Sequence, residues 1–380
     1  MSLKTKDLLR NVCKYIYLAG AGNCWYENVY QENRGYQLYS VLTFTVYTAM
    51  ILLENLAALC GNFPEVEKNS AVMFAAIHNI VLIKMFLLLY HKKSIRELNF
   101  EMSTVGENFE EEHVMKKQYR KAKVGISMYI ISVYLSLVSY GVESARRAII
   151  EGAPFYTVVT YIPFYEDKSL TAFFFRVFFY IVWLYMMLPM MSADCIPIAH
   201  LITMRYKFVT LRHHFERIRN DLDINLLTMN KKEAADKLKA GFLEGIRMHQ
   251  KLLLQCWHYS RWGYVDSQLS PHLDLVNAFM TYTFVGSLFL LLALNLWNAG
   301  EVTYQASLLS SAMFYCGWHL CEYENPPHRD IRRLVIIGCA QAQKPLVLKA
   351  FGMQDLSYET FVAVARMTYS VFAVFYQRGG

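Results

Sequence analysis

Long apolar stretches are the feature that most restricts how this sequence can fold. A helix of about 20 apolar residues can span a bilayer, because a helix satisfies its own backbone hydrogen bonds there. Only 18% of the residues are charged, whereas soluble domains carry about 25%. The sequence therefore predicts an all-α membrane protein with seven transmembrane helices. They are Leu38–Cys60, Ala71–Tyr90, Val124–Val142, Leu170–Met204, Leu275–Trp297, Val302–Leu320 and Leu356–Arg378.

The Lys and Arg residues lie mainly on one side of these predicted helices. The chain has 38 of them, and most fall before the first helix or after the second, fourth and sixth. Since Lys and Arg gather on the cytosolic side, we predict a cytosolic amino terminus and an extracellular carboxyl terminus. This orientation is the reverse of that of a G-protein-coupled receptor. The basic residues flank apolar stretches instead of forming one stripe, so nucleic acid is not expected as a partner.

The predicted cytosolic segment 205–273 is too long to be a structureless loop. Its apolar residues recur at helical spacing, for example Leu238, Phe242 and Ile246. We expect the fourth and fifth helices to continue below the membrane as long amphipathic helices. Their apolar faces need partners, which are either other parts of this chain or other subunits.

The last predicted helix, Leu356–Arg378, is apolar overall but carries many polar side chains. Lipid disfavours such groups, whereas a water-filled path accommodates them. We therefore predict that this helix lines a pore, although packing against other helices would also explain its polar residues.

Five Asp, Glu, Lys or Arg side chains lie more than one turn from the ends of the predicted membrane helices, where they need partners or access to water. They are Glu54, Lys84, Arg176, Asp194 and Arg366. Lys84 lies near a cytosolic helix end, so its ammonium group can extend to the interface. Asp194 lies between Pro189 and Pro197, where we expect the helix to bend. We predict a structural hydrogen bond for Asp194.

Aromatic and other apolar side chains gather in the predicted outer halves of the second to sixth helices. Such residues often only pack, but a pocket made of them would bind small apolar molecules by shape and buried area. We expect a ligand site of this kind. The candidate residues are Met73, Phe74, Ile77, His78, Tyr134, Leu137, Val138, Phe174, Phe178, Tyr304, Ser307 and Leu308.

The sequence contains no arrangement typical of catalysis or of a cofactor site. It lacks a P-loop, a dinucleotide-binding glycine motif and a nucleophile elbow. His319, Cys321 and His328 match no standard zinc spacing, and His213 and His214 are expected to be solvated. The 8 cysteines form no CxxC pair and are predicted to be buried thiols. We therefore predict no enzyme activity, no cofactor and no metal.

Three motifs follow one another near the carboxyl end. Phe314–Glu324 reads FYCGWHLCEYE, and Arg332 and Arg333 precede AQAQKPLVLKAFG at Ala340–Gly352. The ending reads LSYETFVAVARMTYSVFAVF. In this order they resemble the insect odorant receptor family: its sixth-helix ending, its short helix before the last span, and its last helix. The earlier part of the chain is similar only in its helix count, orientation and long cytosolic helices.

The resemblance implies a ligand-gated, non-selective cation channel in the plasma membrane of sensory neurons. It implies a heterotetramer with the family's co-receptor subunits, surrounded by membrane lipid and permeated by monovalent and divalent cations. A small volatile organic ligand would bind in the outer halves of helices two to six. The last helix of each subunit would line one central pore.

The family's pore residues can be placed on this sequence by their spacing. The co-receptor ends in a Phe-x-Val-x-x-Gln run, with Val at the gate and Gln just outside it. Phe372, Val374 and Gln377 match that run, and Ser370 completes the predicted pore and gate set. Arg378 departs from it, because the co-receptor has an apolar residue there.

Two alternatives stay open from the sequence. A related gustatory receptor would form a homomeric channel, but its TYxxxxxQF ending is not matched here. A transporter would show inverted repeats, and the prolines of the fourth helix have no counterpart elsewhere. The predicted regions are a cytosolic segment 1–37, helices one to four with the ligand pocket at 38–204, a cytosolic anchor 205–273, helices five and six at 274–320, a connection with a short helix 321–355, and the pore helix 356–380.

Overall fold

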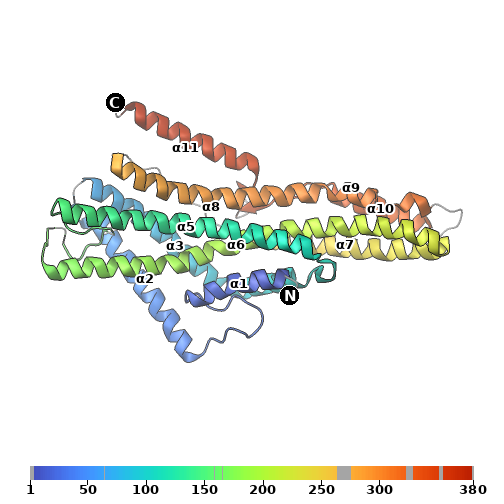
Figure 1. Ribbon diagram of the computed structural model, residues 1–380, viewed down its shortest axis with the longest axis horizontal. Coiled ribbons are helices and arrows are strands. Elements are labelled where there is room, and N and C mark those ends of the chain that lie inside the picture. Colours follow the sequence, from blue (N-terminus) through green and yellow to red (C-terminus); the bar gives the residue numbers. More distant parts are fainter. Residues whose placement is uncertain are drawn as a thin grey trace.

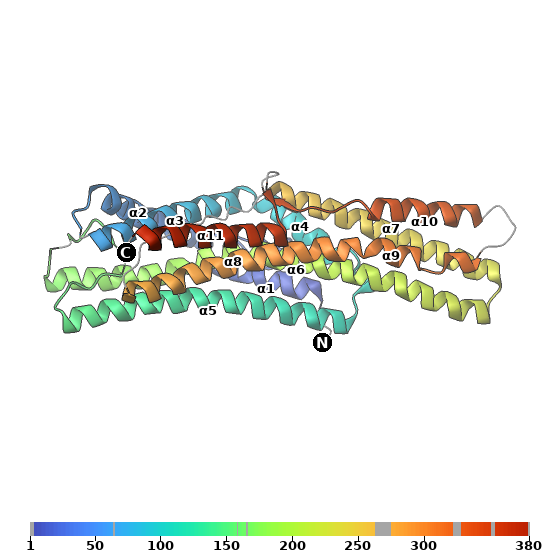
Figure 2. The ribbon, with the colours of Figure 1, turned by 90° about the horizontal axis from the view of Figure 1, so that it is seen from above.

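The computed structural model describes an elongated bundle of helices that run mostly along one long axis (Figure 1, Figure 2). The described residues are 4–63, 65–157, 159–164, 166–262, 275–321, 328–350 and 354–378. Within them, the side chains of 65–67, 69, 70, 73, 261, 262, 275–284, 328–330, 369 and 371–378 are not described. The amino-terminal end of the described chain lies near the middle of the long axis, whereas the last helix ends toward one extremity (Figure 1).

Helices account for nearly all of the regular structure. They are α1 (Thr5–Leu18), α2 (Arg34–Cys60), α3 (Glu65–Tyr90), α4 (Lys92–Thr104), the 3-10 turn η1 (Glu107–Phe109), α5 (Glu112–Ile150), α6 (Leu170–Thr228), α7 (Lys231–Trp262), α8 (Leu275–Ser307), α9 (Leu309–Phe314), the 3-10 turn η2 (Trp318–Cys321), α10 (His328–Ala342) and α11 (Tyr358–Arg378). A short antiparallel ribbon joins β1 (Lys349–Ala350) to β2 (Gln354–Asp355). The prediction of an all-α protein therefore holds apart from this ribbon.

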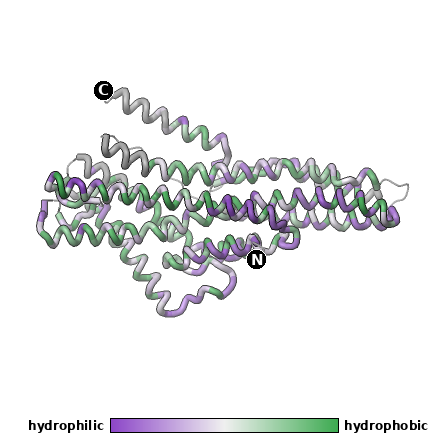
Figure 3. The backbone as a smooth tube through the Cα atoms, in the orientation of Figure 1, coloured by the Kyte–Doolittle hydropathy of each residue, from purple (hydrophilic) through white to green (hydrophobic). Residues whose placement is uncertain are grey.

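Among the described residues, 4 helical segments are long and apolar enough to cross a membrane: α2, α5, α6 and the stretch Val285–Cys321. A fifth candidate is formed by α3 and the segment Lys92–Phe109 together, which meet at a bend of 68°. Figure 3 shows hydrophobic residues predominating along α2 and the Leu170 end of α6, with more hydrophilic residues around α1 and the start of α5. The apolar part of the chain thus occupies one half of the long axis.

The prediction of separate fifth and sixth membrane helices is wrong, because α8 runs without a break from Leu275 to Ser307. The polar residues between the two predicted spans find partners without a break in the helix. Asn298 Nδ2 donates to the Leu294 carbonyl at 2.6 Å, and Glu301 pairs with Arg205 of α6 at 2.7 Å. These residues therefore do not form the expected turn.

The helix α6 supports the expected extension of the fourth membrane helix into the predicted anchor segment, whereas the residues that would join α7 to the predicted fifth helix lie outside the described part of the chain. It runs for 59 residues and contains Pro189 and Pro197. Beyond Met204 it packs against α7, where Phe215 meets the Phe242 ring at 5.4 Å and His214 Nε2 donates to the Gly241 carbonyl at 3.0 Å. His214 is buried, so the expectation that it is solvated is wrong. A side chain at position 245 would collide with the Phe215 ring, so Gly245 permits this close approach.

The first helix was not predicted, although its sequence contains a signal for it. Leu8, Leu9, Val12, Cys13 and Ile16 of α1 are buried and recur at helical spacing. The helix packs against α4 and α6. A buried hydrogen bond also connects α4 to the segment that follows α1, because Asn99 Nδ2 donates to the Cys24 carbonyl at 2.9 Å. The amino-terminal segment is therefore part of the core of the bundle.

The segment before the last helix departs from expectation. Ala340–Gly352 was expected to form a short helix, but α10 ends at Ala342 and the chain then passes Pro345 into β1. Proline lacks the amide hydrogen that a continuing helix would need. The preceding residues Arg332 and Arg333 do lie in the short helix α10.

Acidification is expected to destabilise this bundle through His249 of α7. Burial lowers the pKa of His249 to about 4, from an ordinary value of 6.5. The unfolded chain therefore binds the extra proton first as the pH falls below 6.5. We expect the free energy of unfolding to decrease by about 2 kcal/mol between pH 7 and pH 5 on account of this residue.

Thermal unfolding of the detergent-solubilised protein at several pH values measures this effect. His249→Gln should have a shallower pH dependence than the parent, because Gln does not titrate. His319→Gln changes an exposed histidine and serves as the control. Equal slopes for the parent and His249→Gln would contradict the prediction.

Candidate functional site

A buried polar triad joins three of the apolar helices. It consists of Glu54 from α2, His78 from α3 and Trp183 from α6, each at most 3% exposed. His78 Nδ1 lies 2.5 Å from Glu54 Oε2, and Trp183 Nε1 donates to His78 Nε2 at 3.2 Å. Since the indole nitrogen can only donate, His78 Nε2 must accept, and the proton of a neutral imidazole sits on Nδ1 and is donated to Glu54. The geometry thus assigns one tautomer to His78.

Aromatic rings enclose this triad. Phe74 stacks with His78 at 6.0 Å and meets Trp183 edge to face at 5.6 Å. Tyr140 of α5 packs edge to face against Phe74 at 5.5 Å. These rings and the three polar side chains are called the triad cluster below. It brings α2, α3, α5 and α6 together, so a change in one of these side chains would alter the packing of four helices.

The structure places part of the predicted ligand set in or near the triad cluster. Phe74 and His78 belong to it, and Ile77 and Leu137 are buried in the same hydrophobic core. The Leu137 carbonyl accepts a hydrogen bond from the Tyr180 hydroxyl at 3.2 Å, and Tyr180 in turn packs against Trp183. Tyr134 is partly buried, with its hydroxyl 3.4 Å from the Leu184 carbonyl.

Other predicted ligand residues point away from this core. Val138, Phe174 and Phe178 are exposed, at 49%, 62% and 58%. They lie on the outer faces of α5 and α6. The side chain of Met73 lies outside the described residues.

Tyr304, Ser307 and Leu308 are not brought to the triad cluster. Their neighbour Gln305 accepts a hydrogen bond from Arg212 Nη1 of α6 at 3.1 Å. Along α6, Arg212 lies roughly 40 Å from Trp183, at about 1.5 Å per residue. The sequence placed these residues in a separate sixth helix, and the continuity of α8 carries them instead toward the end of the bundle where α7 and α10 lie (Figure 2).

A second polar cluster lies deeper along the same helices. Asp194 of α6 accepts a hydrogen bond from the Tyr129 hydroxyl of α5 at 2.7 Å, so the predicted structural role of Asp194 is confirmed. Lys84 Nζ of α3 lies 3.4 Å from the other oxygen of Asp194. Lys84 therefore pairs across the bundle instead of extending to an interface. A buried carboxylate within reach provides a fixed partner for its ammonium group.

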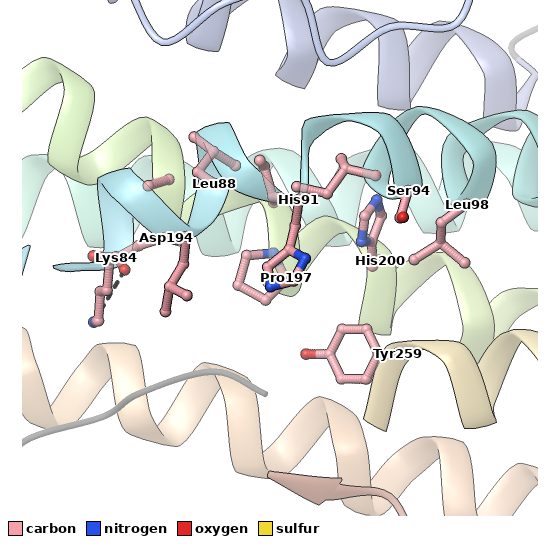
Figure 4. Close-up of a pocket in the computed structure, with 13 residues that line it drawn as sticks. Lys84, Leu88, His91, Ser94, Leu98, Asp194, Pro197, His200 and Tyr259 are labelled. Atoms are coloured by element: carbon pink, nitrogen blue, oxygen red, sulfur yellow. Dashed lines mark hydrogen bonds and ion pairs between the residues drawn. The ribbon is translucent and has the colours of Figure 1, made fainter. Parts of the chain in front are cut away.

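A cavity of about 120 Å³, called the elbow cavity below, opens beside this pair at the bend between α3 and α4. Leu88, Leu98 and Pro197 contribute apolar walls, and His200 and Tyr259 contribute polar groups. Figure 4 shows Lys84 and Asp194 at one end of this elbow cavity, with His200, Leu98 and Tyr259 toward the other. An apolar cavity of about 150 Å³ can hold a single benzene ring. The volume of the elbow cavity is thus close to that needed to hold a small ring or chain.

The last helix has few contacts with the rest of the described chain. Phe361 and Tyr358 of α11 pack against Phe289 and Trp297 of α8, at 5.5 and 5.2 Å. By contrast, Met367 is 71% exposed. Arg366 and Ser370 are exposed too. The side chains of Phe372, Val374 and Gln377 lie outside the described residues, so the structure does not place the predicted gate.

Sequence reasoning missed Tyr140 as a member of a site, and noted Glu54 without a partner. A usable signal was present, because Glu54 and His78 are polar residues in adjacent apolar helices. Polar groups at such positions need each other when lipid is the alternative. The aromatic residues carry no such signal, since their sequence positions do not distinguish packing from binding.

Comparisons with known proteins agree with this architecture. The family model described as 7tm odorant receptor matches residues 62–263 and 267–369. The structure of the insect olfactory receptor OR5 from Machilis hrabei in complex with eugenol is similar over 97% of each chain, with 13% identity and a TM-score of 0.69. Another structure of the same receptor gives 10% identity, a TM-score of 0.70 and coverage of 96% of each chain. No curated protein sequence matches the chain.

Proposed function

Because the chain belongs to the 7tm odorant receptor family, we propose that it is the odorant-binding subunit of a ligand-gated, non-selective cation channel. The family match covers most of the sequence, and the likeness of fold extends over nearly the full length. Members of this family are receptors, so enzyme activity is not expected of this chain. The observation that carries the proposal is this family membership combined with a sparsely packed last helix.

We propose that the protein lies in the plasma membrane with its amino terminus in the cytosol. The distribution of Lys and Arg supports this orientation. So does the position of the basic helices α7 and α10, which lie at the end of the bundle away from the apolar half (Figure 3). That end would form the cytosolic anchor through which subunits assemble with co-receptor chains into a tetramer.

We propose that α11 lines the pore. It packs against α8 through one face and leaves Val362, Arg366 and Met367 exposed in the single chain. In a tetramer these faces would meet other subunits or the ion path. A charged Arg366 at mid-helix is compatible with water and unfavourable in lipid. Monovalent and divalent cations would pass between four such helices.

The proposed ligand is a small volatile molecule with an apolar or aromatic body. A solved relative holds eugenol, which fits that description. The triad cluster supports a binding region there, because it combines aromatic rings with hydrogen-bonding groups and joins four helices. A ligand can open a channel only by binding the open state more tightly than the closed one. Rearranged rings in the cluster would give it that preference.

Recording currents from cells that express this chain tests the proposal. Three sets of cells are compared: one expresses this chain with a co-receptor, one expresses this chain alone, and the control expresses the co-receptor alone. Each is exposed to a panel of volatiles that includes eugenol. Odorant-evoked cation current that requires both chains is expected. Silence across a broad panel at verified surface expression would overturn the proposal. Strong current from this chain alone would favour a homomeric channel of the gustatory receptor type.

Val374→Ser is expected to raise the current in the absence of odorant, if Val374 forms an apolar gate. Such a gate closes by excluding water, and a hydroxyl group makes the constriction easier to wet. Basal current and ion permeability of the complex with the co-receptor are the measurements. Val347→Ser, which changes an exposed valine outside α11, is the control. Unchanged basal current and permeability in Val374→Ser would remove this residue from the constriction.

A further inference from the structure

Three side chains that could bind a metal ion meet where α5 begins beside α6. Glu111 directly precedes α5, His113 lies in the first turn of that helix, and His213 comes from α6. His113 Nδ1 and His213 Nδ1 each lie 3.4 Å from the same oxygen, Oε2 of Glu111. The two imidazole rings are nearly parallel, with centroids 5.8 Å apart. All three ligand atoms lie within 4.8 Å of one another.

These separations fit a common metal geometry. Zinc binds imidazole nitrogen and carboxylate oxygen at about 2.0–2.2 Å, usually in a tetrahedron. Neighbouring ligand atoms of such a tetrahedron are then about 3.3–3.6 Å apart. The two observed distances of 3.4 Å from Glu111 Oε2 fall in that interval. Only a small adjustment of the exposed His113 side chain would bring its nitrogen to the same distance from His213.

From this geometry we infer that Glu111, His113 and His213 form a binding site for a transition-metal dication of the zinc class. Two imidazoles and one carboxylate suit zinc, nickel, copper or iron(II), and water would complete the coordination. Magnesium and calcium prefer oxygen ligands and are not expected to bind. The sequence does not show this site, because a hundred residues separate His113 from His213 and no standard spacing relates them.

Charged side chains from both helices lie close to the site. Arg217 of α6 pairs with the other oxygen of Glu111, Oε1, and leaves Oε2 toward the histidines. Burial acts to raise the pKa of Glu111, but hydrogen bonds to Arg217 and His213 outweigh it and hold the pKa below its ordinary value. The ligand carboxylate is therefore ionised at neutral pH. Lys116 of α5 pairs with Glu112 at 2.8 Å.

A metal at this site would connect the start of α5 to the cytosolic part of α6. Arg217 and Glu111 already join these helices, and a dication bound at Oε2 would add coordinate bonds to that ion pair. The same α6 passes the triad cluster and continues to α7, so a fixed α5–α6 contact would oppose relative movement of the two helices. This consequence rests on the proposed channel function, whereas the binding site itself does not.

Metal binding by the purified full-length chain tests the inference directly. The protein is prepared in detergent without a histidine tag, and its binding of Zn²⁺ is measured by calorimetry. One Zn²⁺ per chain is expected to depend on His113 and His213. His113→Gln and His213→Gln should each weaken binding by at least about tenfold, or about 1.4 kcal/mol. His319→Gln, which changes an exposed histidine outside the site, should leave the affinity unchanged.

A second pair of variants keeps the test decisive if the protein also binds zinc elsewhere. His113→Cys combined with His213→Cys should create a Cd²⁺ site with thiolate-to-metal absorption that neither single variant shows. Affinity for Zn²⁺ that is equal in the parent and both glutamine variants would overturn the inference. So would a lack of stoichiometric binding, or a double cysteine variant without the absorption. None of these results depends on odorant-evoked current, so they can fail independently of the proposed function.

Discussion

Replacing Glu110 with alanine is expected to lower the free energy of unfolding by about 3–5 kcal/mol. Its partner, Lys207 of α6, has a side chain that is 1% exposed. The ammonium group donates to Glu110 Oε1 at 2.7 Å and to the Val105 carbonyl at 2.6 Å. Removing the carboxylate leaves a positive charge in the core with a single neutral acceptor. Losing one partner of a buried pair is much more unfavourable than losing a pair at the surface.

Thermal unfolding of the solubilised protein measures this loss, and the chain offers a matched control two residues away. Glu112 pairs with Lys116 on the surface, where the two side chains are 59% and 64% exposed. Glu112→Ala is therefore expected to change stability by less than about 1 kcal/mol. Adding Lys207→Met to Glu110→Ala should recover most of the stability, because it removes the uncompensated charge. Equal losses for Glu110→Ala and Glu112→Ala would refute the proposed importance of burial.

The membrane character and helical class could be predicted because they depend on summed hydrophobicity. Long apolar stretches identify helices whatever their neighbours are. The end of a helix is less certain, since it depends on where polar groups find partners. Asn298 and Glu301 illustrate this: they lie between two predicted helices, but a backbone carbonyl and Arg205 satisfy them while α8 continues. The continuous helix therefore keeps Tyr304, Ser307 and Leu308 apart from the triad cluster.

The candidate site shows the same division. Asp194 between two prolines could be assigned a structural hydrogen bond, because a buried carboxylate needs a donor in almost any fold. Its donor, Tyr129, lies on another helix and could not be named from the sequence. His213 shows the opposite failure. The sequence predicts that His213 is solvated beside other basic residues, yet the fold brings Glu111 and His113 against it from a segment about a hundred residues earlier. The physical rule was adequate in each case, and the missing information was which helices are neighbours.

His78→Leu is expected to destabilise the protein more than Glu54→Leu, although both substitutions break the same contact. His78→Leu leaves the acidic side chain of Glu54, which is 2% exposed, without its imidazole donor, and this should lower the free energy of unfolding by about 3 kcal/mol or more, because an unsatisfied acidic group costs more than a neutral one. Glu54→Leu leaves a neutral imidazole with one unsatisfied N–H group, which should lower it by about 1–3 kcal/mol. The asymmetry follows from the tautomer that Trp183 imposes on His78.

The double variant Glu54→Leu with His78→Leu separates folding from ligand binding. Removing both polar groups together should restore stability to near that of Glu54→Leu or above it, because no buried charge remains. The Trp183 N–H then lacks its acceptor, which limits the recovery. If the triad cluster binds the odorant, this stable variant should still reach the cell surface with the co-receptor and yet need a higher odorant concentration for half-maximal current. Unfolding temperature, surface labelling and the odorant dose–response together make the measurement. A stable double variant with an unchanged dose–response would indicate that the odorant does not bind at the triad cluster. The elbow cavity beside Lys84 and Asp194 would then be the next region to test.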